Sequence, residues 1–406
     1  MTIVEQYRSK QAGDSRSALH KVAAVWVLLF INVLTFTTLP TLLHVPHRIG
    51  QLVTQGSLPV ALVIALMCNR KGLIKTNLFL GLFSLLALTS FMMSVRLVGI
   101  GTLYRGSRLV LFVVILWLLT PWWGRRDLFL ARVHLRVLTV VTFLVAIGAL
   151  LAHHKAFETE GRLSGTIWPI DPPGVAHYSA EVVGLTVILW LCGIVKRRYV
   201  MIVVPVGLAV LLLSHTRTAL LALALGLLVA GGSLLITRRK VRVGFVSVVI
   251  IAVVLGPLAA PAVTHWLERG EDTQELTSLT GRTSAWNLVL STHEPETNKI
   301  LGQGITNDSV DGLPIDDSWL TLYQNSGIVG DIVAGALFLL LIVAAGFAPA
   351  GPARALAVFL IVFCLMSSFT ETGLGNASPY MLDLTVAASL LSPVLKLKRP
   401  ALREAV

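Results

Sequence analysis

The residues best suited to chemistry in this sequence are arginines and carboxylates that flank long apolar segments. Arg217 lies between two apolar stretches in Ser214-His-Thr-Arg-Thr218, and Arg282 lies in Gly281-Arg-Thr-Ser-Ala-Trp286. A guanidinium at a membrane surface is costly unless an anion pairs with it, and phosphate fits its planar fork well. Both arginines are therefore candidates for binding phosphate. The alternatives are a boundary arginine that reaches lipid headgroups at position 217 and a solvated loop arginine at position 282.

Carboxylates follow at the start of a later apolar segment. Asp316 and Asp317 open it in Asp316-Asp-Ser-Trp-Leu320, where a carboxylate is able to take the proton of an attacking hydroxyl group. An aspartate beside a helix start also commonly caps free backbone N–H groups, and the sequence leaves both interpretations open. Glu371, near the outer end of a span, is a candidate partner for an arginine.

Further arginines lie on the same predicted face. Arg162 occurs in Gly161-Arg-Leu-Ser-Gly165, and Arg105 is one of three arginines near the membrane surface between residues 96 and 108. One lipid-linked pyrophosphate would explain so many arginines on an otherwise acidic face, and lipid headgroups are the alternative. The histidines, His177 among them, are scattered without metal-site spacing, so we interpret them as interface residues and predict neither a metal nor another cofactor.

The elements that must position these residues are long apolar helices. The chain has 406 residues, 55% of them hydrophobic and 13% charged, which excludes an ordinary soluble protein. Its apolar segments predict an all-α, polytopic membrane protein with about twelve transmembrane helices, forming one domain over residues 1–406. The predicted spans are 22–44, 51–68, 76–95, 103–123, 137–152, 178–195, 199–214, 218–236, 243–263, 318–347, 355–370 and 380–395.

The net charge of +12 indicates topology rather than a nucleic-acid partner. Short basic clusters at every second connection hold 23 of the 33 lysines and arginines, and such clusters face the cytoplasm. Both termini are then cytoplasmic, with tails at 1–21 and 396–406. Two longer outer loops are predicted at 153–177 and at 264–317, before the tenth span. The second contains a predicted short helix over 283–290, and loops of this length commonly carry function.

The order of these motifs resembles the O-antigen ligase and O-antigen polymerase superfamily of bacterial membrane glycosyltransferases. The resemblance covers about residues 161–371. It rests on Gly-Arg-Leu at 161–163, Ser-x-Thr-Arg-Thr-Ala at 214–219, Gly-Arg-Thr-x-x-Trp at 281–286, Leu-Gly-Gln-Gly at 301–304 and Asp-Asp-Ser-Trp-Leu at 316–320.

The resemblance implies transfer of a glycan from undecaprenyl pyrophosphate to a hydroxyl group of a glycan or lipid acceptor. The reaction would take place on the outer, periplasmic face of the bacterial cytoplasmic membrane, without a metal or a nucleotide sugar. Arg217 and Arg282 would bind the pyrophosphate. Ligases of this family carry His-Asn where this chain has Asp316-Asp317, so Asp316 would be the base, and a polymerase or a ligase for another surface polymer is favoured. Supporting roles in substrate binding are expected for Arg105, Arg162, Asp317 and Glu371.

Three other functions are compatible with a polytopic membrane protein. A transporter or lipid flippase would show an inverted repeat or charges buried in mid-span, and we expect nearly all ionisable residues here at or beyond the outer ends of the spans. A glycosyltransferase that uses a polyprenyl monophosphate sugar would carry acidic residues in its first outer loop, and residues 44–50 contain none. A non-catalytic scaffold is the third alternative.

Overall fold

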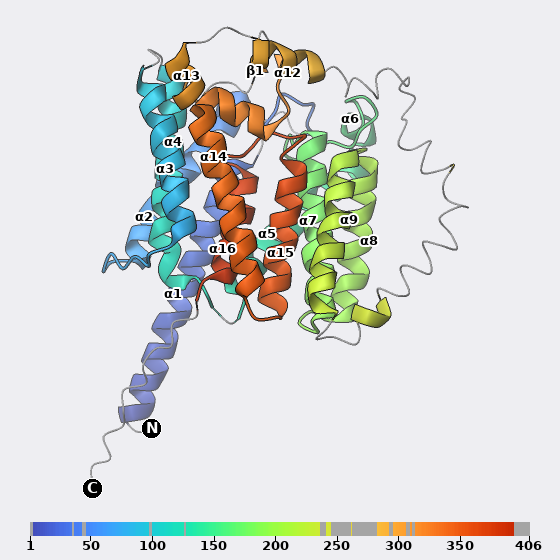
Figure 1. The fold of residues 1–406 in the computed structure, drawn as a ribbon. Helices are drawn as coiled ribbons and strands as arrows, with labels where there is room; N and C mark the ends of the chain where they lie inside the picture. Colours follow the sequence, from blue (N-terminus) through green and yellow to red (C-terminus); the bar gives the residue numbers. More distant parts are fainter. Residues whose placement is uncertain are drawn as a thin grey trace.

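The computed structural model describes residues 3–34, 36–42, 46–96, 100–125, 127–235, 241–244, 261, 282–291, 295–305, 309–310 and 313–393. These residues form a bundle of α-helices (Figure 1). The helices are α1 (Ile3–Val33), α2 (His47–Cys68), α3 (Leu78–Arg96), α4 (Ile100–Leu119), α5 (Phe129–Leu151), α6 (His153–Ala156), α7 (Pro172–Leu191), α8 (Arg197–Leu213), α9 (Arg217–Leu234), α12 (Arg282–Ser291), α13 (Glu296–Leu301), α14 (Ser318–Phe347), α15 (Pro352–Ser367) and α16 (Pro379–Leu391). A 3-10 turn at Thr120–Trp122 follows α4, and the two-residue strands β1 (Ser309–Val310) and β2 (Leu313–Pro314) pair antiparallel.

Among the described residues, seven helices are long and apolar enough to cross a membrane. They are α2, α3, the helix at Gly101–Trp122, α5, α7, α9 and α14, and three shorter apolar helices accompany them. Each predicted span overlaps a helix of the bundle except 243–263, which lies almost entirely outside the described residues. The all-helical membrane fold is thus confirmed, and the total of twelve spans stays a prediction.

Large apolar side chains cover the outside of the bundle. Leu52 of α2 is 72% exposed, Leu150 of α5 is 86% exposed and Phe347 of α14 is 88% exposed. Water would strongly disfavour so much exposed apolar surface, whereas lipid tails would cover it without loss. The chain is an integral membrane protein.

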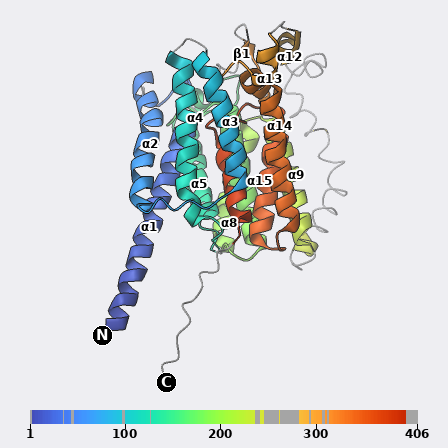
Figure 2. The ribbon, with the colours of Figure 1, turned by 60° about the vertical axis from the view of Figure 1, so that its left-hand side comes forward.

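The two ends of the bundle differ in what they carry. Helix α1 enters and α16 leaves at the same end of the bundle (Figure 1). The short helices α6, α12 and α13 and the strand pair cover the opposite end (Figure 1). Helices α1 and α2 pack side by side at one edge of the bundle (Figure 2). The predicted short helix at 283–290 is present as α12.

Helices α5 and α7 are among those that begin earlier than the sequence predicts. Helix α5 begins at Phe129 rather than at 137, because Arg132 and Arg136 lie on its exposed face and do not interrupt it. Helix α7 begins at Pro172 rather than at 178. These longer helices include His134 and His177, which the predicted spans leave in the connecting segments, and both side chains are buried.

Helices α7, α9 and α15 pack closely around one aromatic side chain. The Phe359 ring of α15 is completely buried and occupies the space beside two glycines. A Cβ atom would lie 2.0 Å from this ring at Gly184 of α7 and 2.8 Å from it at Gly226 of α9. Small residues allow apolar helices to approach closely in a membrane. Helices α7, α9 and α15 are therefore held against one another.

A glycine-rich contact anchors the long connection to α14. The backbone N–H of Gln303 donates to Gln324 O at 2.8 Å, and that of Gly304 donates to Asn325 O at 2.9 Å. Gly327 breaks the regular geometry of α14 with a φ of 64°, and a Cβ there would lie 2.3 Å from the backbone of Ile300. The Gly302-Gln-Gly304 motif is thus a structural contact that holds the connection at the start of α14.

We expect Gly327→Ala to lower the free energy of unfolding by about 2–4 kcal/mol, because a side chain is strained at this φ and overlaps backbone atoms. Gly335→Ala on the same helix is the matched control, since its Cβ would meet no atom within 4 Å. Thermal unfolding of both purified variants in detergent measures the difference. Equal melting temperatures for the two variants would contradict this account of the contact.

Candidate functional site

Two adjoining cavities meet at the segment between α15 and α16. The larger, of about 440 Å³, is lined by polar residues of α2 and α4 and by residues 372–379. The smaller, of about 160 Å³, is lined by the start of α7, by Asp316 and by residues 370–380. Thr372 and Pro379 belong to both walls. The two cavities therefore adjoin each other at this segment.

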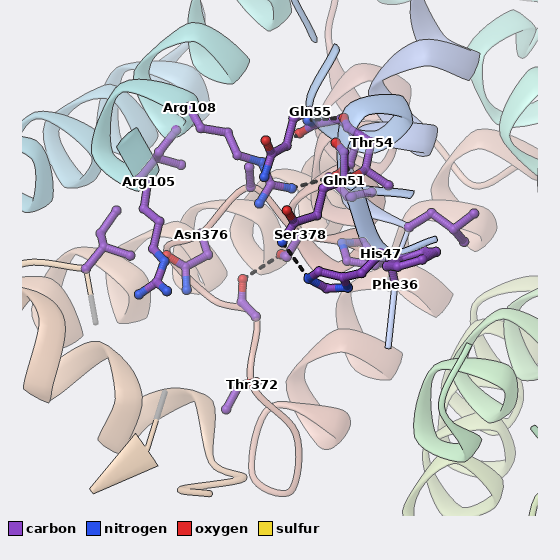
Figure 3. Close-up of a pocket in the computed structure, with 18 residues that line it drawn as sticks. Phe36, His47, Gln51, Thr54, Gln55, Arg105, Arg108, Thr372, Asn376 and Ser378 are labelled. Atoms are coloured by element: carbon purple, nitrogen blue, oxygen red, sulfur yellow. Dashed lines mark hydrogen bonds between the residues drawn. The ribbon is translucent and has the colours of Figure 1, made fainter. Parts of the chain in front are cut away.

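Arginines of α4 line the larger cavity (Figure 3). Arg108 donates from Nε to Asn32 Oδ1 at 3.1 Å and from Nη2 to Asn32 O at 2.6 Å, which ties it to the end of α1. Arg105 lies one turn earlier and points toward Asn376 (Figure 3). Two guanidinium groups among amide side chains make this cavity suited to an anion such as phosphate. The structure thus places Arg105 in the wall of this cavity.

Carboxylates and a histidine line the smaller cavity. Asp316 is half-buried and has a φ of 43°, a left-handed conformation that few residues other than Gly, Asn and Asp adopt readily. Glu371 accepts a hydrogen bond from the Tyr380 hydroxyl at 2.5 Å, and its Oε2 lies 4.0 Å from Nδ1 of His177. The structure therefore brings Asp316 and Glu371 into one cavity, as candidates for moving a proton.

The two adjacent aspartates have different surroundings. Asp317 is buried and accepts a hydrogen bond from the backbone N–H of Leu320 at 2.9 Å, so it caps α14. For Asp317 the structure supports helix capping, one of the two interpretations that the sequence left open. Asp316, one residue earlier, faces the cavity.

Two of the predicted arginines meet at the turn that starts α9. Arg162 donates from Nε to Ser214 O at 3.2 Å and from Nη2 to Thr216 Oγ1 at 3.1 Å. Arg217, the first residue of α9, is half-buried beside this turn. A helix start adds its own free backbone N–H groups to the arginine charge. Arg162 therefore fixes the segment that presents Arg217.

For Arg282 the structure describes the position of the backbone only. It begins α12, and Trp286, one turn later, donates from Nε1 to Ile315 O at 2.9 Å. This bond ties α12 to the residue that precedes Asp316. The Arg282 side chain lies outside the described residues, so its convergence with Arg217 stays a prediction.

A buried polar cluster lies behind the smaller cavity, and the sequence analysis missed it. The Nε2 atom of His134 in α5 lies 3.0 Å from Asp383 Oδ1 in α16 and 3.6 Å from Glu181 Oε2 in α7. His177 is hydrogen-bonded from Nε2 to Asp383 Oδ2 at 3.0 Å. These four buried residues are exceptions to the prediction that nearly all ionisable residues lie at or beyond the outer ends of the spans, and His177 is buried rather than exposed at an interface.

A signal for this cluster was present in the sequence. Glu181 and Asp383 are carboxylates inside apolar spans, and an acid in such a position is a functional candidate by itself. His177 precedes Glu181 by four residues, which places both on one helix face. His134, which lies in a predicted connecting segment, had no such signal.

A comparison with known protein families finds a match that includes part of the candidate site. Residues 202–330, about a third of the chain, match the family model described as O-antigen ligase. Over this segment the chain is similar to the O-antigen ligase family. This confirms the resemblance seen in the order of the motifs. A search of curated proteins found no match.

The O-antigen ligase match covers only part of the candidate site. It includes Arg217, Arg282 and both aspartates at 316 and 317, and it ends at Gly330. The arginines of the larger cavity, Glu371 and the buried cluster all lie outside it. The fold thus adds residues from α4, α5, α7 and α16 to those of the family segment.

The cluster also has the composition of a metal site. His134, Glu181 and Asp383 each offer a ligand atom, and these atoms lie within 4.8 Å of one another. However, Trp26 Nε1 donates to His134 Nδ1 at 3.3 Å, so a neutral imidazole carries its proton on Nε2, the atom that faces Asp383. A protonated nitrogen does not bind a metal. We therefore interpret these contacts as a proton-bearing polar network.

Proposed function

We propose that this protein transfers a glycan from polyprenyl pyrophosphate to a hydroxyl group of a glycan or lipid acceptor. The reaction takes place on the outer face of a bacterial cytoplasmic membrane, as the last step of linking or extending a surface polysaccharide. The observation that carries the proposal is the position of Asp316. This residue of the O-antigen ligase segment lines a cavity that adjoins an arginine-lined one.

The proposed reaction is an inverting displacement at the sugar carbon bound to pyrophosphate. The acceptor oxygen forms the new bond to this carbon, and the bond to the pyrophosphate oxygen breaks with its electron pair. Asp316 takes the hydroxyl proton as the general base. Arg217 and Arg282 stabilise the charge that grows on the pyrophosphate. Since guanidinium groups supply this positive charge, the proposed reaction requires no metal.

The other predicted residues support binding in this scheme. Arg162 holds the turn before α9, Asp317 caps the helix that follows Asp316, and Glu371 shares the smaller cavity with Asp316. Arg105 offers a guanidinium to an anionic part of a substrate in the larger cavity. A carboxylate base in place of the His-Asn pair of ligases favours a polymerase or a ligase for another surface polymer.

We expect Arg105→Gln to raise the KM for the lipid-linked donor or acceptor about tenfold while kcat changes little, because the residue contributes binding rather than chemistry. Arg48→Gln is the control, since Arg48 is exposed on α2 and is not part of the cavity wall. Steady-state kinetics with each substrate varied in turn measures both constants. An unchanged KM for every substrate would remove Arg105 from the binding site.

A lipid or polysaccharide transporter is the second candidate function. The observation that favours it is the cluster of His134, Glu181 and Asp383, which is fully buried among membrane helices, where proton-coupled transporters place such groups. The position of Asp316 in the outer cavity favours the transferase.

Reconstitution into liposomes separates the two functions. The purified protein is supplied with polyprenyl-pyrophosphate-linked oligosaccharide, and the products are analysed both for new glycosidic bonds and for movement of the lipid between leaflets. The proposal predicts bond formation without net movement. Movement of the intact lipid without any new bond, under every acceptor tried, would favour the transporter.

A further inference from the structure

His177 presents its two ring nitrogens to two different environments. Its Nε2 is hydrogen-bonded to Asp383 Oδ2 at 3.0 Å inside the bundle. Its Nδ1 has no hydrogen-bond partner among the described residues; its side chain is only 3% exposed, and Glu371 Oε2 lies 4.0 Å from Nδ1. The ring is part of the wall of the smaller cavity, together with Asp316. A buried nitrogen left unpaired is costly unless it serves a substrate or a proton.

The neighbours of His177 determine which nitrogen is available. When the Asp383 carboxylate accepts from Nε2, the proton of the neutral ring is on Nε2, and Nδ1 carries a lone pair. The aromatic rings of Phe363 and Tyr380, at centroid distances of 5.0 and 4.6 Å, hold the imidazole in place. A buried carboxylate that orients an imidazole in this way also stabilises the imidazolium formed when the ring takes a proton.

A comparison with the second buried histidine, His134, shows that only His177 is suited to accept a proton from the smaller cavity. His134 also faces Asp383, at 3.0 Å from Nε2. Its other nitrogen accepts a hydrogen bond from Trp26, and it is not part of the wall of either cavity. His134 and His177 therefore share one carboxylate, but only His177 presents a lone pair to the cavity that contains Asp316.

We propose that His177, oriented by Asp383, is the terminal proton acceptor of the transfer reaction. This inference rests on the proposed function. The acceptor O–H bond breaks as its oxygen bonds to the sugar carbon, and the proton passes through Asp316 to Nδ1 of His177. The electron pair of the broken sugar–oxygen bond leaves with the pyrophosphate. An imidazole is a stronger base than a carboxylate, so His177 holds the proton until it is released to water. Asp383 is the positioning residue.

Chemical rescue tests this assignment with the full-length protein in liposomes. We expect His177→Ala to lower kcat for glycan transfer at least about 100-fold and added imidazole to restore activity at least about tenfold. The removed ring lay against an existing cavity, which gives imidazole a place to bind. His134→Ala is the matched control, and its activity is expected not to respond to imidazole.

A conservative variant keeps the test decisive if the alanine variant does not fold. His177→Gln retains a side-chain amide that is able to donate to Asp383, and we expect its kcat to fall at least about 100-fold with KM within about threefold of the wild type. Full activity of His177→Gln would overturn the inference, as would a folded His177→Ala protein whose lost activity imidazole does not restore. If the wild-type protein itself forms no glycosidic bond, the proposed function fails instead.

Discussion

Arg217→Ala is expected to reduce kcat for glycan transfer about 100- to 1,000-fold, because it removes a charged donor that the proposed reaction places at the departing pyrophosphate. Arg217 is the first residue of α9, and the free N–H groups of a helix start favour an anion at the same position. Arg217→Lys is expected to retain an intermediate activity, since an ammonium keeps the charge but not the planar fork of donors. Initial rates with purified variants at saturating donor measure both effects.

A control substitution at another arginine distinguishes a loss of catalysis from a loss of stability. Arg197 is also the first residue of a helix, α8, and its side chain is exposed. Helix α8 leads directly into the turn before α9, so Arg197 lies at the opposite end of α8 from Arg217. We expect Arg197→Ala to transfer glycan at the wild-type rate. A folded Arg217→Ala protein that is equally active would contradict the assignment.

The predicted pairing of Arg217 with Arg282 adds a second readout. If both guanidinium groups act on one pyrophosphate, the double alanine variant loses less activity than the product of the two single losses. Independent sites would give multiplicative losses. Rates for the four proteins of this cycle therefore test whether the two arginines share one anion.

Asp316→Asn is expected to lower kcat about 100- to 10,000-fold, because an amide cannot take the proton of the acceptor hydroxyl group. The substitution is nearly isosteric, and asparagine tolerates the left-handed φ of 43° at this position. The fold at the start of α14 is therefore expected to be unaffected. Initial rates and thermal unfolding of the same preparation measure the two properties.

The adjacent aspartate supplies the control for this prediction. Asp317 caps α14 through Leu320 N, and asparagine caps a helix about as well as aspartate does. We expect Asp317→Asn to keep most of the activity and the stability. The reverse outcome, with an active Asp316→Asn protein and an inactive Asp317→Asn protein, would exchange the two roles.

The membrane helices could be predicted from the sequence because each is a long apolar run, and hydropathy alone detects such runs. The residues at which some of the helices begin could not be predicted in this way. Arg132 and Arg136 look like a basic connection, yet they lie on the exposed face of α5, with the buried His134 between them. Average hydropathy hides a helix whose polar residues share one face.

Part of the site was also predictable. The motif order indicated Arg162, Arg217 and Asp316. In the structure, the Arg162 side chain is hydrogen-bonded to the turn before Arg217, and Asp316 lies in a cavity with Glu371. The contact between His177 and Asp383 could not be predicted, because 206 positions separate the two residues in the chain. Only the packing of α7 and α16 against α5 and α15 brings their side chains together.

The most direct test of the central claim is the release of free polyprenyl pyrophosphate by the purified wild-type protein. The account predicts one molecule released for each glycosidic bond formed, only when an acceptor hydroxyl is present, and a rate that falls with Arg217→Ala and with Asp316→Asn. New glycosidic bonds without released pyrophosphate, or release that proceeds equally in both variants, would contradict it.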